Sequence, residues 1–113
     1  MITAKELRDM NRTAITQVVD TYLDTILSKD LTNHASEGKL CIAKGSKTMT
    51  GLLRLFATTV LYPRTCVAGS KVFTEAVDVI QERFKEAGYT LKVMDGDAKD
   101  AMGVSLCDLY LVW

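Results

Sequence analysis

The sequence predicts an α+β fold. We expect a single small domain, residues 1–113, in which a long N-terminal amphipathic helix and two further helices pack on a mixed sheet of about four short strands. The length of 113 residues is that of one domain. With 48% hydrophobic and 25% charged residues, the composition is globular and not disordered. Hydrophobic residues recur at helical spacing in three segments, and four short apolar segments bounded by turn residues have the length of strands.

The first predicted helix begins at a capping box, Thr3 to Glu6, in which the Thr3 hydroxyl accepts a hydrogen bond from the Glu6 amide. Apolar residues then follow in steps of three and four and form one broad stripe. They are Leu7, Met10, Ala14, Ile15, Val18, Val19, Tyr22, Leu23, Ile26 and Leu27. Leu31 and Ala35 extend the stripe towards Gly38, a suitable left-handed stop for a helix.

Two arrangements of this segment are open. A continuous helix over residues 4–37 would be about 50 Å long, whereas a domain of this size has a radius of gyration of about 13 Å. Such a helix would overhang the domain or pair with another chain. The alternative is a break or bend near Ser28, Lys29 and Asp30, where helix propensity falls. We favour the break or bend.

The remaining elements follow in order along the chain. Residues 39–43 form a short strand, and residues 49–60 a short buried helix whose last three residues could instead be extended. Pro63 marks a turn before a second strand at 64–68. Ser70 caps a helix that carries Phe73, Ala76, Val77, Ile80, Phe84 and Ala87 at helical spacing, and Gly88 ends it with Tyr89 folding back.

Two strands, 89–94 and 104–113, close the chain around an acidic loop that contains glycine. The last strand is apolar on both faces, which predicts a position inside the sheet. The acidic loop, "DGDAKD", lacks the glycine position and the later glutamate of an EF-hand, so we interpret it as a solvated hairpin loop.

Two segments repeat the letters G-S-K between a predicted strand and a predicted helix: Cys41 to Lys47 and Cys66 to Lys71. A helix N-terminus offers unpaired amides, glycine permits close approach, serine donates and lysine adds charge, so these loops suit an anion. The candidate anion-binding residues are Lys44, Gly45, Ser46, Lys47, Arg64, Gly69, Ser70 and Lys71. The alternative is an ordinary turn or helix cap at each place. Neither copy has the spacing of the phosphate-binding loop of nucleoside triphosphatases, which excludes that class.

The net charge of zero conceals an uneven layout. Between Glu37 and Glu75 no acidic residue occurs, while six residues are basic: Lys39, Lys44, Lys47, Arg54, Arg64 and Lys71. If these form one surface, they would attract a phosphate-bearing ligand or an acidic protein; otherwise they simply solvate loops. Nucleic acid is a weaker expectation, because Phe56 and Tyr62 are the only aromatic residues between Lys39 and Lys71.

No catalytic constellation can be assembled from the sequence, so we expect a protein that is not an enzyme and needs no cofactor or metal. The cysteines, Cys41, Cys66 and Cys107, are widely spaced, and the single histidine, His34, completes no ligand motif with them. We interpret the cysteines as buried thiols in a reducing cytoplasm and His34 as a surface or capping residue. No apolar segment is long enough to span a bilayer, which predicts no membrane association.

The segments "MITAKELRD", "ERFKEAGYTLKV" and "LCDLYLVW" resemble the ends of small accessory proteins of tailed bacteriophages. These segments cover under half of the chain and contain no chemical motif, so no functional residue is transferred. The resemblance implies a non-enzymatic binding protein of the host-takeover or anti-defence kind, which contacts a host macromolecule, most simply a protein, in the host cytoplasm. The alternative is a binder of a nucleotide or other phosphate-bearing ligand through the G-S-K loops.

The width of the apolar stripe between Ile15 and Leu27 also bears on oligomeric state. Adjacent apolar pairs, Val18-Val19 and Ile26-Leu27, widen the stripe beyond what one small sheet would cover. We therefore expect a homodimer that buries part of this helix. The alternative is that the last helix and the sheet cover the whole stripe.

Overall fold

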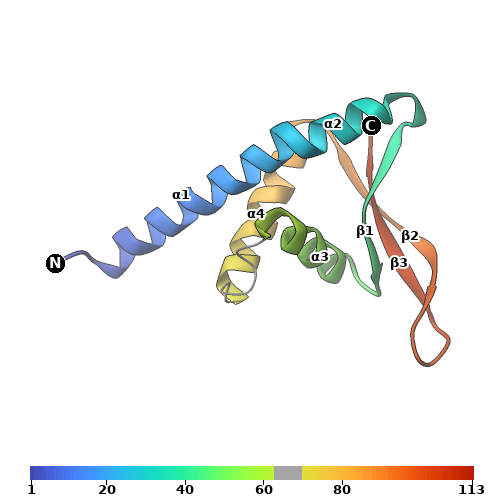
Figure 1. The fold of residues 1–113 in the computed structure, drawn as a ribbon. Helices are drawn as coiled ribbons and strands as arrows, with labels where there is room; N and C mark the ends of the chain where they lie inside the picture. The colour runs from blue at the N-terminus through green and yellow to red at the C-terminus, as the bar shows by residue number, and fades with distance from the viewer. Residues whose placement is uncertain (63–69) are drawn as a thin grey trace.

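The structure is a computed structural model, which describes residues 1–62 and 70–113. It confirms the α+β class: a long N-terminal helix, two further helices and an antiparallel sheet (Figure 1). None of the helices in these described ranges combines the length and hydropathy needed to cross a membrane.

The N-terminal helix is continuous as far as Asn33. It comprises α1 (Ala4–Tyr22), a π-helical turn (Leu23–Leu27) and α2 (Ser28–Asn33), and the three follow one another as one rod in Figure 1. The predicted break at Ser28–Asp30 is therefore wrong. Leu27 before these exposed residues is buried in the core and Leu31 after them packs against it, which favours a continuous helix despite the low propensity. The start is confirmed, since the Glu6 amide donates to the Thr3 hydroxyl at 3.1 Å. Gly38 is left-handed as predicted, but it ends a short 3₁₀ turn, Ala35–Glu37, and not the helix itself.

The π-helical turn keeps the buried side chains of the rod in line. Ile15, Val19, Leu23 and Leu27 are all buried, and each is four residues after the last. In a regular helix of 3.6 residues per turn, such a series drifts steadily around the axis and leaves the core. The wider π turn, in which the Ser28 amide donates to the Leu23 carbonyl, takes up that drift.

The sheet has three strands, β1 (Lys39–Ser46), β2 (Thr90–Lys99) and β3 (Ser105–Val112), in the order β1-β3-β2. Both pairings are antiparallel, so the predicted mixed sheet of four strands is corrected to three antiparallel ones among the described residues. The strand expected at 64–68 lies outside them. The central place of β3 is confirmed, since a strand with a neighbour on each edge tolerates apolar side chains on both faces.

The acidic "DGDAKD" segment is mostly strand and not loop. β2 continues as far as Lys99, and the chain reverses between Asp100 and Val104. Apart from the half-buried Gly96, residues 95–99 are exposed, so this end of β2 extends beyond the core.

The two remaining helices agree closely with the prediction. α3 (Met49–Leu61) is helical throughout, including residues 58–60, and α4 (Ser70–Glu86) ends as expected. At its end Gly88 has φ of 87°, the Tyr89 amide donates to the Phe84 carbonyl at 2.9 Å, and the Gly88 amide donates to the Lys85 carbonyl at 3.1 Å. This is a Schellman motif.

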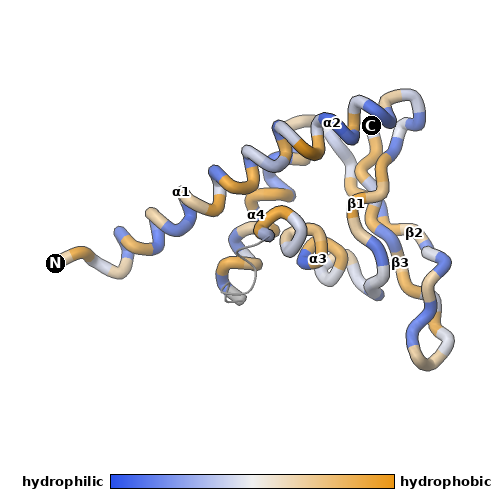
Figure 2. Tube along the Cα trace, in the orientation of Figure 1, coloured by the Kyte–Doolittle hydropathy of each residue, from blue (hydrophilic) through white to orange (hydrophobic). Residues whose placement is uncertain are grey.

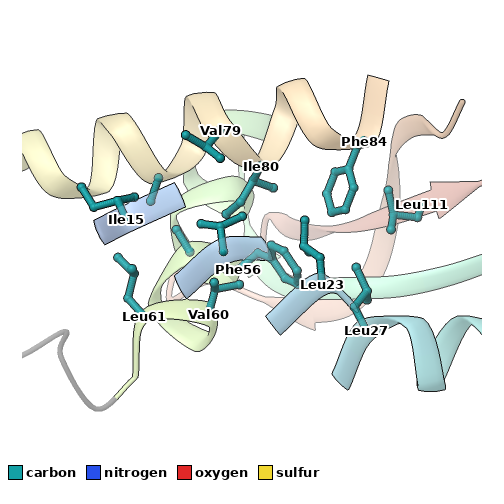
Figure 3. Packing of buried hydrophobic residues seen from close by; sticks show 13 residues of the cluster. Ile15, Leu23, Leu27, Phe56, Val60, Leu61, Val79, Ile80, Phe84 and Leu111 are labelled. Atoms are coloured by element: carbon teal, nitrogen blue, oxygen red, sulfur yellow. The ribbon is translucent and has the colours of Figure 1, made fainter. Parts of the chain in front are cut away.

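The core lies where α1, α3 and α4 cross, and it continues onto the sheet (Figure 3). Buried side chains of the larger cluster include Ile15, Val19, Leu23, Leu27, Phe56, Val60, Leu61, Val79, Ile80, Phe84 and Leu111. A second cluster, Leu52, Leu53 and Leu109, joins α3 to β3. Val18 and Tyr22 also pack against the larger cluster, so α3 and α4 cover most of the stripe that suggested a dimer.

The N-terminal end of the rod projects beyond this core. Every residue from 1 to 14 is exposed, and Figure 1 shows the first turns of α1 extending away from the other elements. The overhang explains why the radius of gyration is 15.4 Å and the longest dimension 53 Å, against about 13 Å expected for a compact chain of this length.

Candidate interaction surface

The first G-S-K loop is held by contacts within the protein. The Lys47 ammonium lies 2.6 Å from the Asp100 carboxylate at the far hairpin turn. Thr48 caps α3, because its hydroxyl accepts from the Gly51 amide at 3.0 Å. The Ser46 hydroxyl lies against Gly51, where a β-carbon would collide with it. The Lys47 ammonium and the Thr48 hydroxyl therefore already have partners, which favours the interpretation of the loop as a turn and helix cap.

Of the other candidate anion-binding residues that the structure describes, two lie on β1 and two at the start of α4. Lys44 is exposed on β1 opposite Asp108, and Gly45 has φ of 88° at an irregularity in the β1–β3 pairing. Ser70 begins α4, and Lys71 is exposed on its first turn. Arg64 and Gly69 lie outside the described residues, so the second loop is described only from Ser70 onwards.

The described members of the basic middle do not form one surface. The register places Lys39 and Lys44 on the outer face of the sheet, together with Lys92 of β2. Lys39 lies over the Tyr110 ring at 5.5 Å on that face. Arg54 instead lies over the Phe73 ring between α3 and α4, at 5.8 Å. The positive charge that is continuous in the sequence is thus divided among separate places.

The helix α4 has no basic exposed face. In helix-turn-helix proteins the second of two successive helices enters the DNA major groove, and α4 follows α3 in this way. Its exposed charged residues are Lys71 and Lys85 on the one hand and Asp78, Glu82 and Glu86 on the other. Phosphate contacts depend on lysine and arginine, so α4 offers a poor surface for nucleic acid.

The projecting end of α1 carries an apolar strip, which we define as Leu7, Met10 and Ala14. These residues follow at steps of three and four and so share one face. Leu7 is 53% exposed and Met10 62% exposed. Figure 2 shows hydrophobic and hydrophilic residues alternating along this part of α1. The strip is a second apolar face, distinct from the buried face that begins at Ile15.

The strip continues into a groove between α1 and the end of α3, with a volume of about 600 Å³. We call it the α1–α3 groove; it is lined by Ala14, Gln17, Val18, Thr21, Tyr22, Thr25, Ile26, Val60, Leu61 and Tyr62. No lining residue is charged. Ile26 and Tyr62 are 53% and 76% exposed. Because Ala14 belongs to both, strip and groove form one uncharged surface along α1.

An acidic row lies beside this surface. Glu6, Asp9, Asp20 and Asp24 share one side of the helical rod, next to the row of the strip. The Asp20 carboxylate accepts from Arg83 at 2.8 Å. The other three are exposed, and no ion pair joins them to any residue in the part of the chain that the structure describes.

The two described cysteines and the histidine belong to no cluster of potential metal ligands among the described residues. Cys41 and Cys107 are half-buried free thiols, not the fully buried ones expected, and Cys66 lies outside the described residues. Partial burial raises the pKa of Cys41, and nearby Asp108 adds to the shift. His34 follows α2 and its Nδ1 lies 2.8 Å from the Asp30 carbonyl, as expected of a capping residue. Residues 1–62 and 70–113 contain no cluster of three potential metal ligands.

Comparison with known proteins adds no assignment: no family model, curated protein or solved structure matches this chain.

The strip was not predicted, because Leu7 and Met10 were placed in the same stripe as Ile15 and Val19. The sequence nevertheless contains a pattern that separates them. The row through Leu7, Met10 and Ala14 continues to the polar residues Gln17 and Thr21, whereas Ile15 starts a different row. Only the position of α3, however, makes a groove beside the first row.

Proposed function

We propose that this chain is a non-enzymatic binding protein that acts by contact with another protein, and that the apolar strip and the α1–α3 groove form its contact surface. The observation that carries the proposal is the exposure of Leu7 and Met10 on a projecting helix that leads into an uncharged groove. Completing the burial of two half-exposed side chains of this size is worth about 1 kcal/mol each. Contiguous exposed apolar surface of this kind is typical of interaction sites.

The resemblance of the terminal segments to phage accessory proteins supports a host protein as the partner. The anchoring of the groove supports the same role, since α1 is held in the core from Ile15 onwards. At the groove a partner would therefore meet a preformed helix, which lowers the entropic cost of binding.

A phosphate-bearing ligand at the G-S-K loops is the weaker proposal. An anion at the first loop would compete with Asp100 for Lys47, and the Thr48 hydroxyl already accepts from the first turn of α3. A thermal-shift panel of nucleotides tests it, since a ligand at 100 times its dissociation constant adds about 2.7 kcal/mol.

Affinity capture tests the proposed function. Tagged wild-type protein and Met10→Glu are used to capture partners from a bacterial lysate, with Met102→Glu as the matched control. Both methionines are largely exposed, but Met102 lies at the β2–β3 turn, remote in sequence from α1. We expect one stoichiometric partner on the wild type and on the control, and its loss from Met10→Glu. A partner retained by Met10→Glu, or none on any bait, would contradict the proposal.

A further inference from the structure

We infer that the occupant of the strip and groove is a basic amphipathic α-helix of the partner, not a second copy of this chain. The inference rests on the proposed function and adds the chemistry of the partner. It follows from the length of the uncharged surface, the acidic row beside it and the consequence of pairing two copies.

The length of the surface fits a helix. The strip and groove extend along α1 and the π-helical turn from Leu7 to Ile26, and 20 residues of helix measure about 30 Å. The surface is also narrow, since charged residues lie beside it along α1. A long, narrow and uncharged surface is suited to the apolar face of an amphipathic helix, which places anchoring side chains at steps of three and four.

The acidic row favours a partner helix with positive charge. Glu6, Asp9 and Asp24 are exposed and without an ion pair within the described ranges. A helix seated on the strip would place the residues that flank its apolar face beside these carboxylates. Lysine or arginine at those flanks would form three ion pairs, whereas glutamate or aspartate would be repelled.

A second copy does not meet this requirement. The arrangement that puts the strip of each copy into the groove of the other is antiparallel and two-fold, with Ala14 near the axis. It brings Glu6 and Asp9 of one copy alongside Asp24 and Asp20 of the other, because the same side of each helix then meets its equivalent. Glu6 of each copy would face the unpaired Asp24 of the other, and Asp9 would meet an Asp20 that already pairs with Arg83. Pairing of copies is therefore opposed at the Glu6–Asp24 contacts.

Two synthetic helical peptides test the inference by fluorescence anisotropy. They share one leucine face, and their flanking positions carry lysine in one and glutamate in the other. We expect the full chain to bind the lysine peptide about tenfold more tightly at low salt, as three exposed ion pairs would give. The preference should shrink as salt screens the charges.

The triple variant Glu6→Gln, Asp9→Asn and Asp24→Asn should bind both peptides about equally. Asp20 is left intact because it pairs with Arg83. The matched control, Asp78→Asn, Asp95→Asn and Asp97→Asn, removes the same charge from exposed positions on α4 and β2 and should keep the preference.

Three results would overturn the inference: failure of the lysine peptide to bind, equal binding of both peptides to the wild type, or a preference that survives in the triple variant. A fourth contradicting result would come from sedimentation. If the wild type were a dimer and Met10→Glu a monomer, the occupant would be a second copy of this chain. If any of these results were obtained while capture of the partner still depended on Met10, the proposed function would be supported. Only the inference of a basic helix would then be rejected.

Discussion

Lys47 and Asp100 join two turns that are far apart in the sequence. The Lys47 ammonium follows β1 and lies 2.6 Å from the Asp100 carboxylate at the β2–β3 turn. The same carboxylate accepts from the amides of Met102 and Val104 at 2.9 and 3.0 Å. One side chain thus fixes the geometry of the hairpin turn and ties it to the start of α3.

This arrangement predicts a pH dependence. The Lys47 ammonium, followed by the Val104 and Met102 amides, holds the pKa of Asp100 below its usual value of 3.8. Because the folded pKa is lowered, the stabilisation is complete above pH 3.8 and is lost as the pH falls through the folded pKa. Amide chemical shifts of Met102 and Val104 should therefore titrate with a midpoint below 3.8. In Lys47→Gln the midpoint should rise; an unchanged midpoint would show that Lys47 is not the cause.

The π turn predicts that one deletion is tolerated. Thr25 is exposed within the turn, and removing it should convert the turn to regular helix while Leu23 and Leu27 stay in the core. Thr21 is equally exposed but lies in regular helix, so its deletion should rotate Val19 and Ile15 away from the core. We expect the Thr25 deletion to cost about 1 kcal/mol and the Thr21 deletion several, by the loss of buried side chains. Denaturant unfolding compares the two; equal costs would contradict this account of the turn.

Substitutions of Gly88 test the motif that ends α4. The φ of Gly88 is 87°, in the left-handed region, where a β-carbon costs about 1–2 kcal/mol. Gly88→Ala should therefore lower the free energy of unfolding by that amount. Gly88→Asn should lower it less, since asparagine tolerates this conformation. If both variants were as stable as the wild type in urea, the Schellman motif would contribute nothing.

The burial of Leu109 predicts that the smaller core cluster contributes strongly to the stability of the fold. Leu109 is fully buried at the centre of β3, against Leu52 and Leu53 of α3. Leu109→Ala should cost about 2–5 kcal/mol through lost burial and the cavity it leaves. Met102→Ala removes a comparable side chain from an exposed turn and should change stability by less than about 0.5 kcal/mol. Thermal or chemical unfolding of both variants measures the difference.

Features that depend on neighbours in the chain were predictable from the residues alone. They include the Thr3 cap, the left-handed Gly38 and Gly88, the existence of α3, the end of α4 and the central place of β3. Caps, turns and hydrophobic periodicity are set by interactions over three to five residues, and the letters of the sequence contain them directly.

Features that depend on contacts between residues distant in the chain could be known only from the tertiary structure. Ser28–Asp30 remains helical because Leu23 and Leu27 are held in the core on one side of it, which no local propensity reveals. Lys47 meets Asp100, and Arg54 meets Phe73, so the basic middle does not act as a unit. The strip at Leu7 and Met10 is exposed because α3 and α4 cross α1 only from Ile15 onwards. Periodicity shows that a helix has an apolar face, but only packing determines which part of that face is left uncovered.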